Sequence, residues 1–122
     1  MTLKVMLTAV LLLGVCLPLR ARERMTLKVS PAVAFAPANL IVRTMIEADS
    51  RNRAVEIVAE SDDFYRSSEI QLDGEHAPRT TTFEFRSLPP GAYEVKATLL
   101  GSNGASLATV RHQMNVIATG SH

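Results

Sequence analysis

The histidines and methionines of this sequence include one set that could bind a soft metal. His112 is followed two residues later by Met114, and Met45 occurs elsewhere in the chain. Imidazole and thioether ligands together suit copper, so a copper site is one interpretation. The alternative is structural, because methionine commonly fills space in cores and a lone histidine near a sheet edge commonly forms hydrogen bonds. We favour the structural interpretation and predict no metal site and no cofactor.

Acidic residues gather in two short segments that could bind calcium. Glu60, Asp62 and Asp63 form the first, and Asp73 and Glu75 form the second. Carboxylate oxygens would suit calcium if the two segments met. Neither segment has an established ligand spacing, so we interpret them as solvated turns.

Phe64, Tyr65 and Arg66 follow the first acidic segment and form the predicted binding site. Adjacent aromatic residues in a loop point in opposite directions, so at least one ring should be exposed. An exposed ring beside arginine suits contact with a sugar or a protein partner. The alternative is that both rings cap the open end of the domain.

The sequence contains no recognisable catalytic constellation. No serine lies in a nucleophile-elbow sequence, and no glycine-rich loop could cradle a phosphate. The single cysteine, Cys16, lies in the apolar N-terminal run, so residues 25–122 offer no thiol. We therefore predict that the chain is not an enzyme.

Charge is distributed unevenly along the chain. Residues 1–24 carry a net charge of +3, whereas residues 25–122 hold nine basic and eleven acidic side chains. A mildly acidic domain lacks the basic surface that nucleic acid binding needs. We predict no nucleic acid partner.

The first 21 residues are typical of an export signal. Lys4 precedes an uncharged run over residues 5–19, which is shorter than the roughly twenty residues of a membrane-spanning helix. We predict a signal peptide or short anchor over 1–21, a linker over 22–26 and a secreted or periplasmic location. Lipidation of Cys16 stays open. So does a start at Met25, because the Met-Thr-Leu-Lys-Val of residues 1–5 recurs at 25–29.

The remainder alternates apolar and polar residues in segments separated by turn signals, which indicates β-strands. We expect seven strands. The first, over 27–35, is interrupted by Pro31 and suits an edge strand that switches sheets. Asp73-Gly74 is expected to close a hairpin, and residues 118–122 to form a disordered tail. The expected strands cover residues 27–35, 40–48, 53–60, 68–72, 80–86, 92–100 and 105–116.

The stretch Leu-Pro-Pro-Gly-Ala-Tyr at residues 88–93 is the most specific structural signal. We expect Leu88 and Gly91 to shape a turn and Tyr93 to bury its ring while its hydroxyl bonds the preceding backbone. With this corner, residues 25–117 resemble bacterial fibronectin type III-like and PKD-like domains. That resemblance implies an all-β, seven-stranded immunoglobulin-like antiparallel sandwich over 27–117.

Such modules serve in adhesion, carbohydrate contact or spacing, so the resemblance implies an exported, non-enzymatic interaction module. Its partner would be a protein or a carbohydrate, and only an uncleaved N-terminal segment would contact a membrane. The alternative function is a small periplasmic carrier that binds a metal or another ligand.

Overall fold

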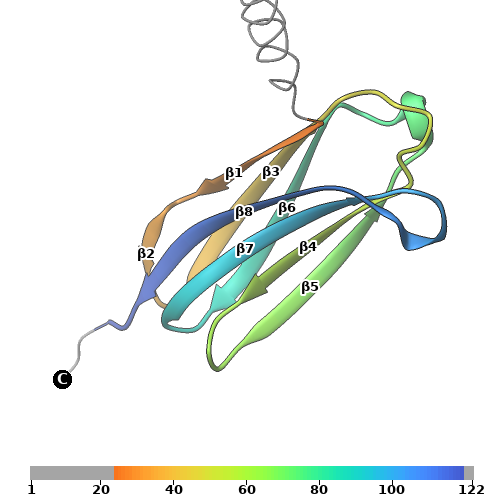
Figure 1. Cartoon of the computed structure of the whole chain (residues 1–122). Helices are drawn as coiled ribbons and strands as arrows, with labels where there is room; N and C mark the ends of the chain where they lie inside the picture. The colour runs from red at the N-terminus through yellow and green to blue at the C-terminus, as the bar shows by residue number, and fades with distance from the viewer. Residues whose placement is uncertain (1–23, 120–122) are drawn as a thin grey trace, which may run out of the picture.

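The computed structural model describes residues 24–119, which fold into two β-sheets without an α-helix (Figure 1). The smaller sheet has the order β1 (Met25–Ser30), β3 (Ala38–Ile46) and β6 (Thr80–Leu88). The larger, curled sheet has the order β2 (Val33–Phe35), β8 (Ser106–Ile117), β7 (Gly91–Leu100), β4 (Ala54–Glu60) and β5 (Tyr65–Gln71). Within the described range, no helix has the length and apolar character to cross a membrane.

The chain changes sheets between β1 and β2, as the sequence predicts. β1 pairs antiparallel with β3, whereas β2 pairs parallel with β8 in the other sheet. Pro31 lies between the two strands and cannot donate a backbone hydrogen bond to a ladder. The predicted single strand over 27–35 is therefore two strands. The prediction of seven strands is wrong, because the described residues form eight.

Alternating apolar residues place a continuous core between the sheets. In β7, the inward residues Tyr93, Val95, Ala97 and Leu99 are fully buried. β3 alternates buried and more exposed residues from Ala38 to Ile46, and the strand ends before Ala48, which is exposed. The period of two in the sequence thus predicts correctly which face of each central strand is buried.

The predicted hairpin at Asp73-Gly74 does not exist. β5 belongs to the larger sheet and β6 to the smaller one, so the chain crosses between sheets here. A short 3₁₀ turn, Gly74–His76, occupies the crossing. Gly74 has φ of 52°, and a Cβ there would lie 3.1 Å from Ser50 O. Glycine is thus needed for a tight crossing rather than for a two-residue hairpin turn.

The stretch at residues 88–93 carries the chain from β6 back to β7. Leu88 and Tyr93 are completely buried, and the Tyr93 hydroxyl donates a hydrogen bond of 2.8 Å to Pro89 O. A Cβ on Gly91 would lie 3.1 Å from the Ser61 side chain, so the glycine allows the close approach of two loops. The bond expected from Tyr93 to the preceding backbone is therefore present.

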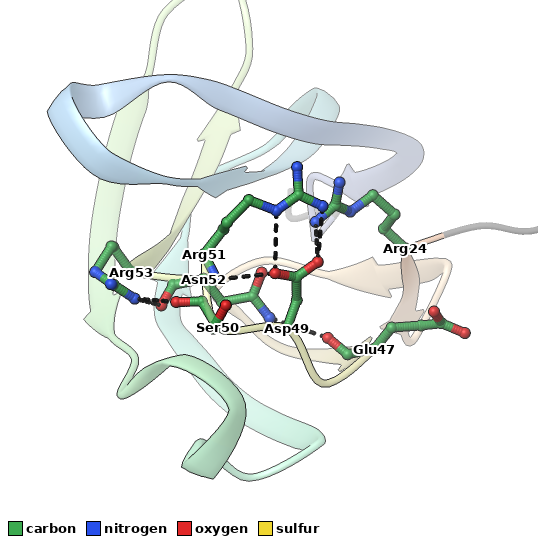
Figure 2. A network of polar contacts seen from close by, with 7 residues as sticks. All are labelled: Arg24, Glu47, Asp49, Ser50, Arg51, Asn52 and Arg53. Carbon is green, nitrogen blue, oxygen red and sulfur yellow. Dashed lines mark hydrogen bonds and ion pairs between the residues drawn. The ribbon is translucent and has the colours of Figure 1, made fainter.

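A polar network fixes the loop between β3 and β4 to the start of β1 (Figure 2). The Asp49 carboxylate accepts hydrogen bonds from the guanidinium groups of Arg24 and Arg51 and from the Arg51 backbone N–H. These bonds, first that of the Arg51 side chain, hold the pKa of Asp49 well below its ordinary value. Asn52 is buried and donates to Glu47 O at 3.0 Å.

The predicted signal or anchor at 1–21, the first two residues of the 22–26 linker and the end of the predicted tail lie outside the described residues. Cys16, and with it the lipidation hypothesis, also lies there. These stay predictions. β1 begins at Met25, two residues before the predicted start of the domain.

Candidate functional site

An open groove of about 750 Å³ lies where β1 of the smaller sheet meets β8 of the larger one. A groove of this size falls within the range of small-molecule sites. Its lining contains basic, uncharged polar and apolar side chains but no Asp or Glu. The lining residues are Leu27, Lys28, Val29, Ser30, Ala32, Ile41, Arg43, His112 and Gln113.

Strand register brings two of the basic residues side by side. Lys28 of β1 is directly opposite Arg43 of β3, and the next outward pair is Ser30 with Ile41. Directly opposed side chains in an antiparallel pair have Cβ atoms roughly 5 Å apart, and like charges in such positions destabilise the sheet. An anion bound between them would remove this repulsion.

Among residues 24–119, Lys28 and Arg43 have no acidic partner. Other arginines are paired: Arg24 and Arg51 with Asp49, Arg86 with Glu84, and Arg111 with Glu94. Glu84 is opposite Ile41 on β6, near the groove, but its carboxylate engages Arg86 at 3.1 Å. The groove therefore presents two uncompensated positive charges.

His112 adds an imidazole to the β8 side of the groove. It is opposite Val95 and shares a strand face with Met114, so its predicted inward register is correct. Its side chain is nevertheless exposed and lines the groove. Gln113, the next residue, supplies an amide to the same lining.

The predicted site residues Phe64, Tyr65 and Arg66 do not lie in this groove. Phe64 packs edge-on against Tyr93 with ring centroids 6.1 Å apart, and the Arg66 guanidinium lies 5.1 Å from the Phe64 ring. Arg66 also donates to Arg86 O at 2.9 Å and so connects β5 to β6. Tyr65 is 60% exposed. Phe64 is partly buried and helps to hold the end of the domain together, whereas Tyr65 and Arg66 are both exposed. The binding role predicted for these residues stays a prediction.

The metal hypotheses find no support in the geometry. His112 and Met45 line different cavities, and Met114 is fully buried. The acidic segments lie at opposite ends of the β4–β5 pair, because Glu60 is opposite Tyr65 while Ala54 is opposite Gln71. In the described part of the chain, no three His, Cys, Asp or Glu side chains gather closely enough to hold a metal ion.

Sequence comparisons give no relatives, since no protein-family model matches the chain and no curated protein is significantly similar to it. Comparison of structures does find neighbours. Superoxide reductase (neelaredoxin) from Ignicoccus hospitalis superposes with a TM-score of 0.61 at 12% identity, over 77% of this chain and 80% of that chain. The chain has the fold of this protein.

Two further structures superpose on the chain. A variant of the same Ignicoccus hospitalis superoxide reductase gives a TM-score of 0.54 at 14% identity, over 75% of this chain and 79% of the other. A family 76 glycoside hydrolase from a bovine Bacteroides thetaiotaomicron strain gives 0.58 at 14% identity, over 75% of this chain. That match covers only 20% of the hydrolase chain.

The superoxide reductase neighbours contradict the predicted membership of the fibronectin type III-like and PKD-like domains. The physical reason lies in the motif. A buried tyrosine that bonds backbone suits any crossing between two packed sheets, because its hydroxyl needs a partner there. The corner at Tyr93 therefore identifies a crossing and does not identify a family.

The same neighbours contradict the prediction of a non-enzymatic interaction module, because they are enzymes. The alternative prediction, a small metal- or ligand-binding protein, agrees with them better. Local motifs reveal catalytic groups only when these are close in the sequence. A site in a two-sheet fold is assembled from different strands, which local motifs do not capture.

Superoxide chemistry requires a redox-active group, and metals or organic cofactors supply such groups in proteins. Residues 24–119 do not fit a metal centre, since they bring no three suitable ligands together. We derive no redox step from them.

The sequence does not predict the groove residues Lys28, Arg43, Ser30 and Ile41. The predicted strands 27–35 and 40–48 do not give the register that pairs Lys28 with Arg43, because matching their ends would place Lys28 opposite Glu47. For His112 the sequence favours a structural role, with a metal ligand as the alternative, and does not indicate a place in a basic groove.

Proposed function

We propose that this protein binds a small anionic ligand in the groove between β1, β3 and β8. The observation that carries the proposal is the direct opposition of Lys28 and Arg43 without an acidic partner among residues 24–119. This arrangement destabilises the free sheet, and such local costs are concentrated at functional sites. Superoxide, the substrate in the name of two structural neighbours, is itself a small anion.

The chemistry of the lining supports recognition of an oxyanion. The Arg43 guanidinium can donate two parallel hydrogen bonds to a carboxylate, and Lys28 adds a compact ammonium charge. Ser30, Gln113 and His112 offer further donors on the two sides of the groove. Since the groove is open to solvent, we expect weak, salt-sensitive binding.

The proposal is tested by titrating the full chain with sodium acetate and sodium sulfate at low ionic strength, with NMR of the backbone amides as the readout. Shifts should concentrate at Lys28, Arg43 and His112. Lys28→Gln and Arg43→Gln should each weaken binding about tenfold, because each removes a charge-assisted hydrogen bond.

Lys96→Gln is the matched control. It removes the same charge from the larger sheet, where Lys96 is opposite Val58 and Arg111 and does not line the groove. Equal losses of affinity in all three variants, or shifts spread over the whole surface, would contradict a specific site and indicate general charge attraction.

A further inference from the structure

We infer that the ligand of this groove is an amphipathic anion, namely a soluble carboxylate that carries an apolar chain of several carbons. This inference rests on the proposed anion site and adds the chemical class of the ligand. The inference follows from the apolar side chains that lie beside Lys28 and Arg43.

Apolar side chains form much of the groove next to Lys28 and Arg43. Val29 adjoins Lys28 along β1, and Ile41 lies two residues from Arg43 on the same face of β3. Leu27 also lines the groove but is buried in the core, so Val29 and Ile41 supply most of its accessible apolar surface. Val29 and Ile41 are only half-buried although both are large and apolar, and Ala32 is exposed. Covering this surface would be favourable in proportion to the apolar area removed from water.

The size of the groove argues against an inorganic anion as its sole occupant. Its volume is about 750 Å³, whereas one water molecule takes about 30 Å³ in the liquid. An inorganic anion the size of a few water molecules would neutralise Lys28 and Arg43 but would leave the apolar part of the groove exposed to solvent. A carboxylate with a chain would satisfy both parts, with its head at Lys28 and Arg43 and its chain along Ile41.

An acidic peptide added as a strand fits less well. Such a strand would lie between β1 and β8 and needs about 10 Å between them, because neighbouring strands are roughly 4.8 Å apart. Cα atoms of β1 and β8 already come within 8 Å of each other, and Figure 1 shows the two strands passing side by side. The spacing therefore favours a narrow ligand.

The test is a chain-length series on the full protein: acetate, butyrate, hexanoate and octanoate, kept below the concentration at which octanoate forms micelles. Affinity should rise about two- to fourfold for each added methylene that the groove covers. Amide shifts at Lys28, Ile41 and His112 make the readout specific to the groove. Hexanol, which lacks the carboxylate, should bind at least about tenfold more weakly than hexanoate.

Ile41→Ser separates the two parts of the site. It should flatten the dependence on chain length while leaving acetate affinity within about twofold, since Ile41 contributes apolar surface and no charge. Met45→Ser is the matched control, because Met45 occupies the same face of the same strand but lines a different cavity. It should leave the whole series unchanged.

The outcomes of these experiments distinguish the inferred amphipathic ligand from the proposed anion site on which it rests. Equal affinity for acetate, sulfate and octanoate, each reduced by Arg43→Gln, would overturn the amphipathic ligand and keep the anion site. Tighter binding of an acidic peptide than of octanoate at the same residues would also overturn it. Binding of no anion, or binding indifferent to Lys28 and Arg43, would overturn both.

Discussion

Tyr93 shows how one buried polar atom is accommodated in this small core. Its ring is completely buried against Phe64, and its hydroxyl donates to Pro89 O. Burial raises the pKa of Tyr93, so the side chain stays a neutral donor. By contrast, Thr44 Oγ1 and Asn52 Oδ1 are buried without a hydrogen-bond partner. A satisfied hydroxyl thus stabilises the crossing from β6 to β7.

Tyr93→Phe keeps the ring and deletes this hydrogen bond. We expect the free energy of unfolding to fall by about 0.5–1.5 kcal/mol, measured by urea denaturation. Tyr65→Phe is the control, since Tyr65 is 60% exposed and its substitution should change stability by less than about 0.5 kcal/mol. Equal effects of the two substitutions would show that the Tyr93 hydroxyl contributes no more than a solvated one.

At the scale of elements, the loop between β3 and β4 is held by charge. Asp49 joins Arg51 within the loop to Arg24 before β1, and the Glu47 backbone N–H donates to Arg24 O at 2.9 Å. Figure 2 shows the two guanidinium groups converging on the one carboxylate. The loop therefore anchors the entry of the first strand.

This anchor should weaken in acid. The folded-state pKa of Asp49 lies below its ordinary value of 3.8, so its contribution is present above about pH 4 and is lost as the pH falls through the folded value. Asp49→Asn should therefore be less stable than the parent at about pH 7, and the difference should shrink towards about pH 2. Urea denaturation across this range measures it.

Two arginine variants test whether the ion pairs of Asp49 cause this pH dependence of stability. Arg51→Gln removes the partner that lowers the pKa of Asp49 most and should reduce the same pH dependence. Arg53→Gln should not, because the Arg53 guanidinium donates to the carbonyl groups of Ser50 and Asn52 and not to Asp49. A difference between Asp49→Asn and the parent that stays constant down to about pH 2 would contradict the ion-pair explanation.

At the scale of the whole molecule, stability should decrease from the centre of the larger sheet towards its β2 edge. β7 lies between β4 and β8, and its inward residues are fully buried, whereas Val33 and Phe35 of β2 are 54% and 66% exposed. Central strands open only with global unfolding, while short edges open locally.

Native-state hydrogen exchange should reveal this gradient. The amides of Val95 and Ala97 should exchange among the slowest in the protein, and those of β2 at least about a hundredfold faster. NMR-detected exchange measures both sets in one sample. Similar rates in β2 and β7 would show that β2 is as firmly held as the centre of the sheet.

The sequence predicts the strands far better than the site. Alternation in β3, β4 and β7, and the break at Pro31, follow from local rules of pleating and proline geometry. The groove depends on the approach of β1 to β8, residues about eighty positions apart, and no local pattern encodes that approach. The Asp73-Gly74 error has the same origin, because a turn signal does not specify to which sheet the chain returns.

The start of β1 and the end of β8 lie at opposite ends of the fold, which determines how the fold would carry mechanical load. Arg24 enters β1 at one end of the molecule, and the chain leaves β8 at the other (Figure 1). A pull at these two points acts along β1 and β8, so the ladders of β1 with β3 and of β8 with β7 are loaded in shear. The hydrogen bonds of each ladder would then break together instead of one by one.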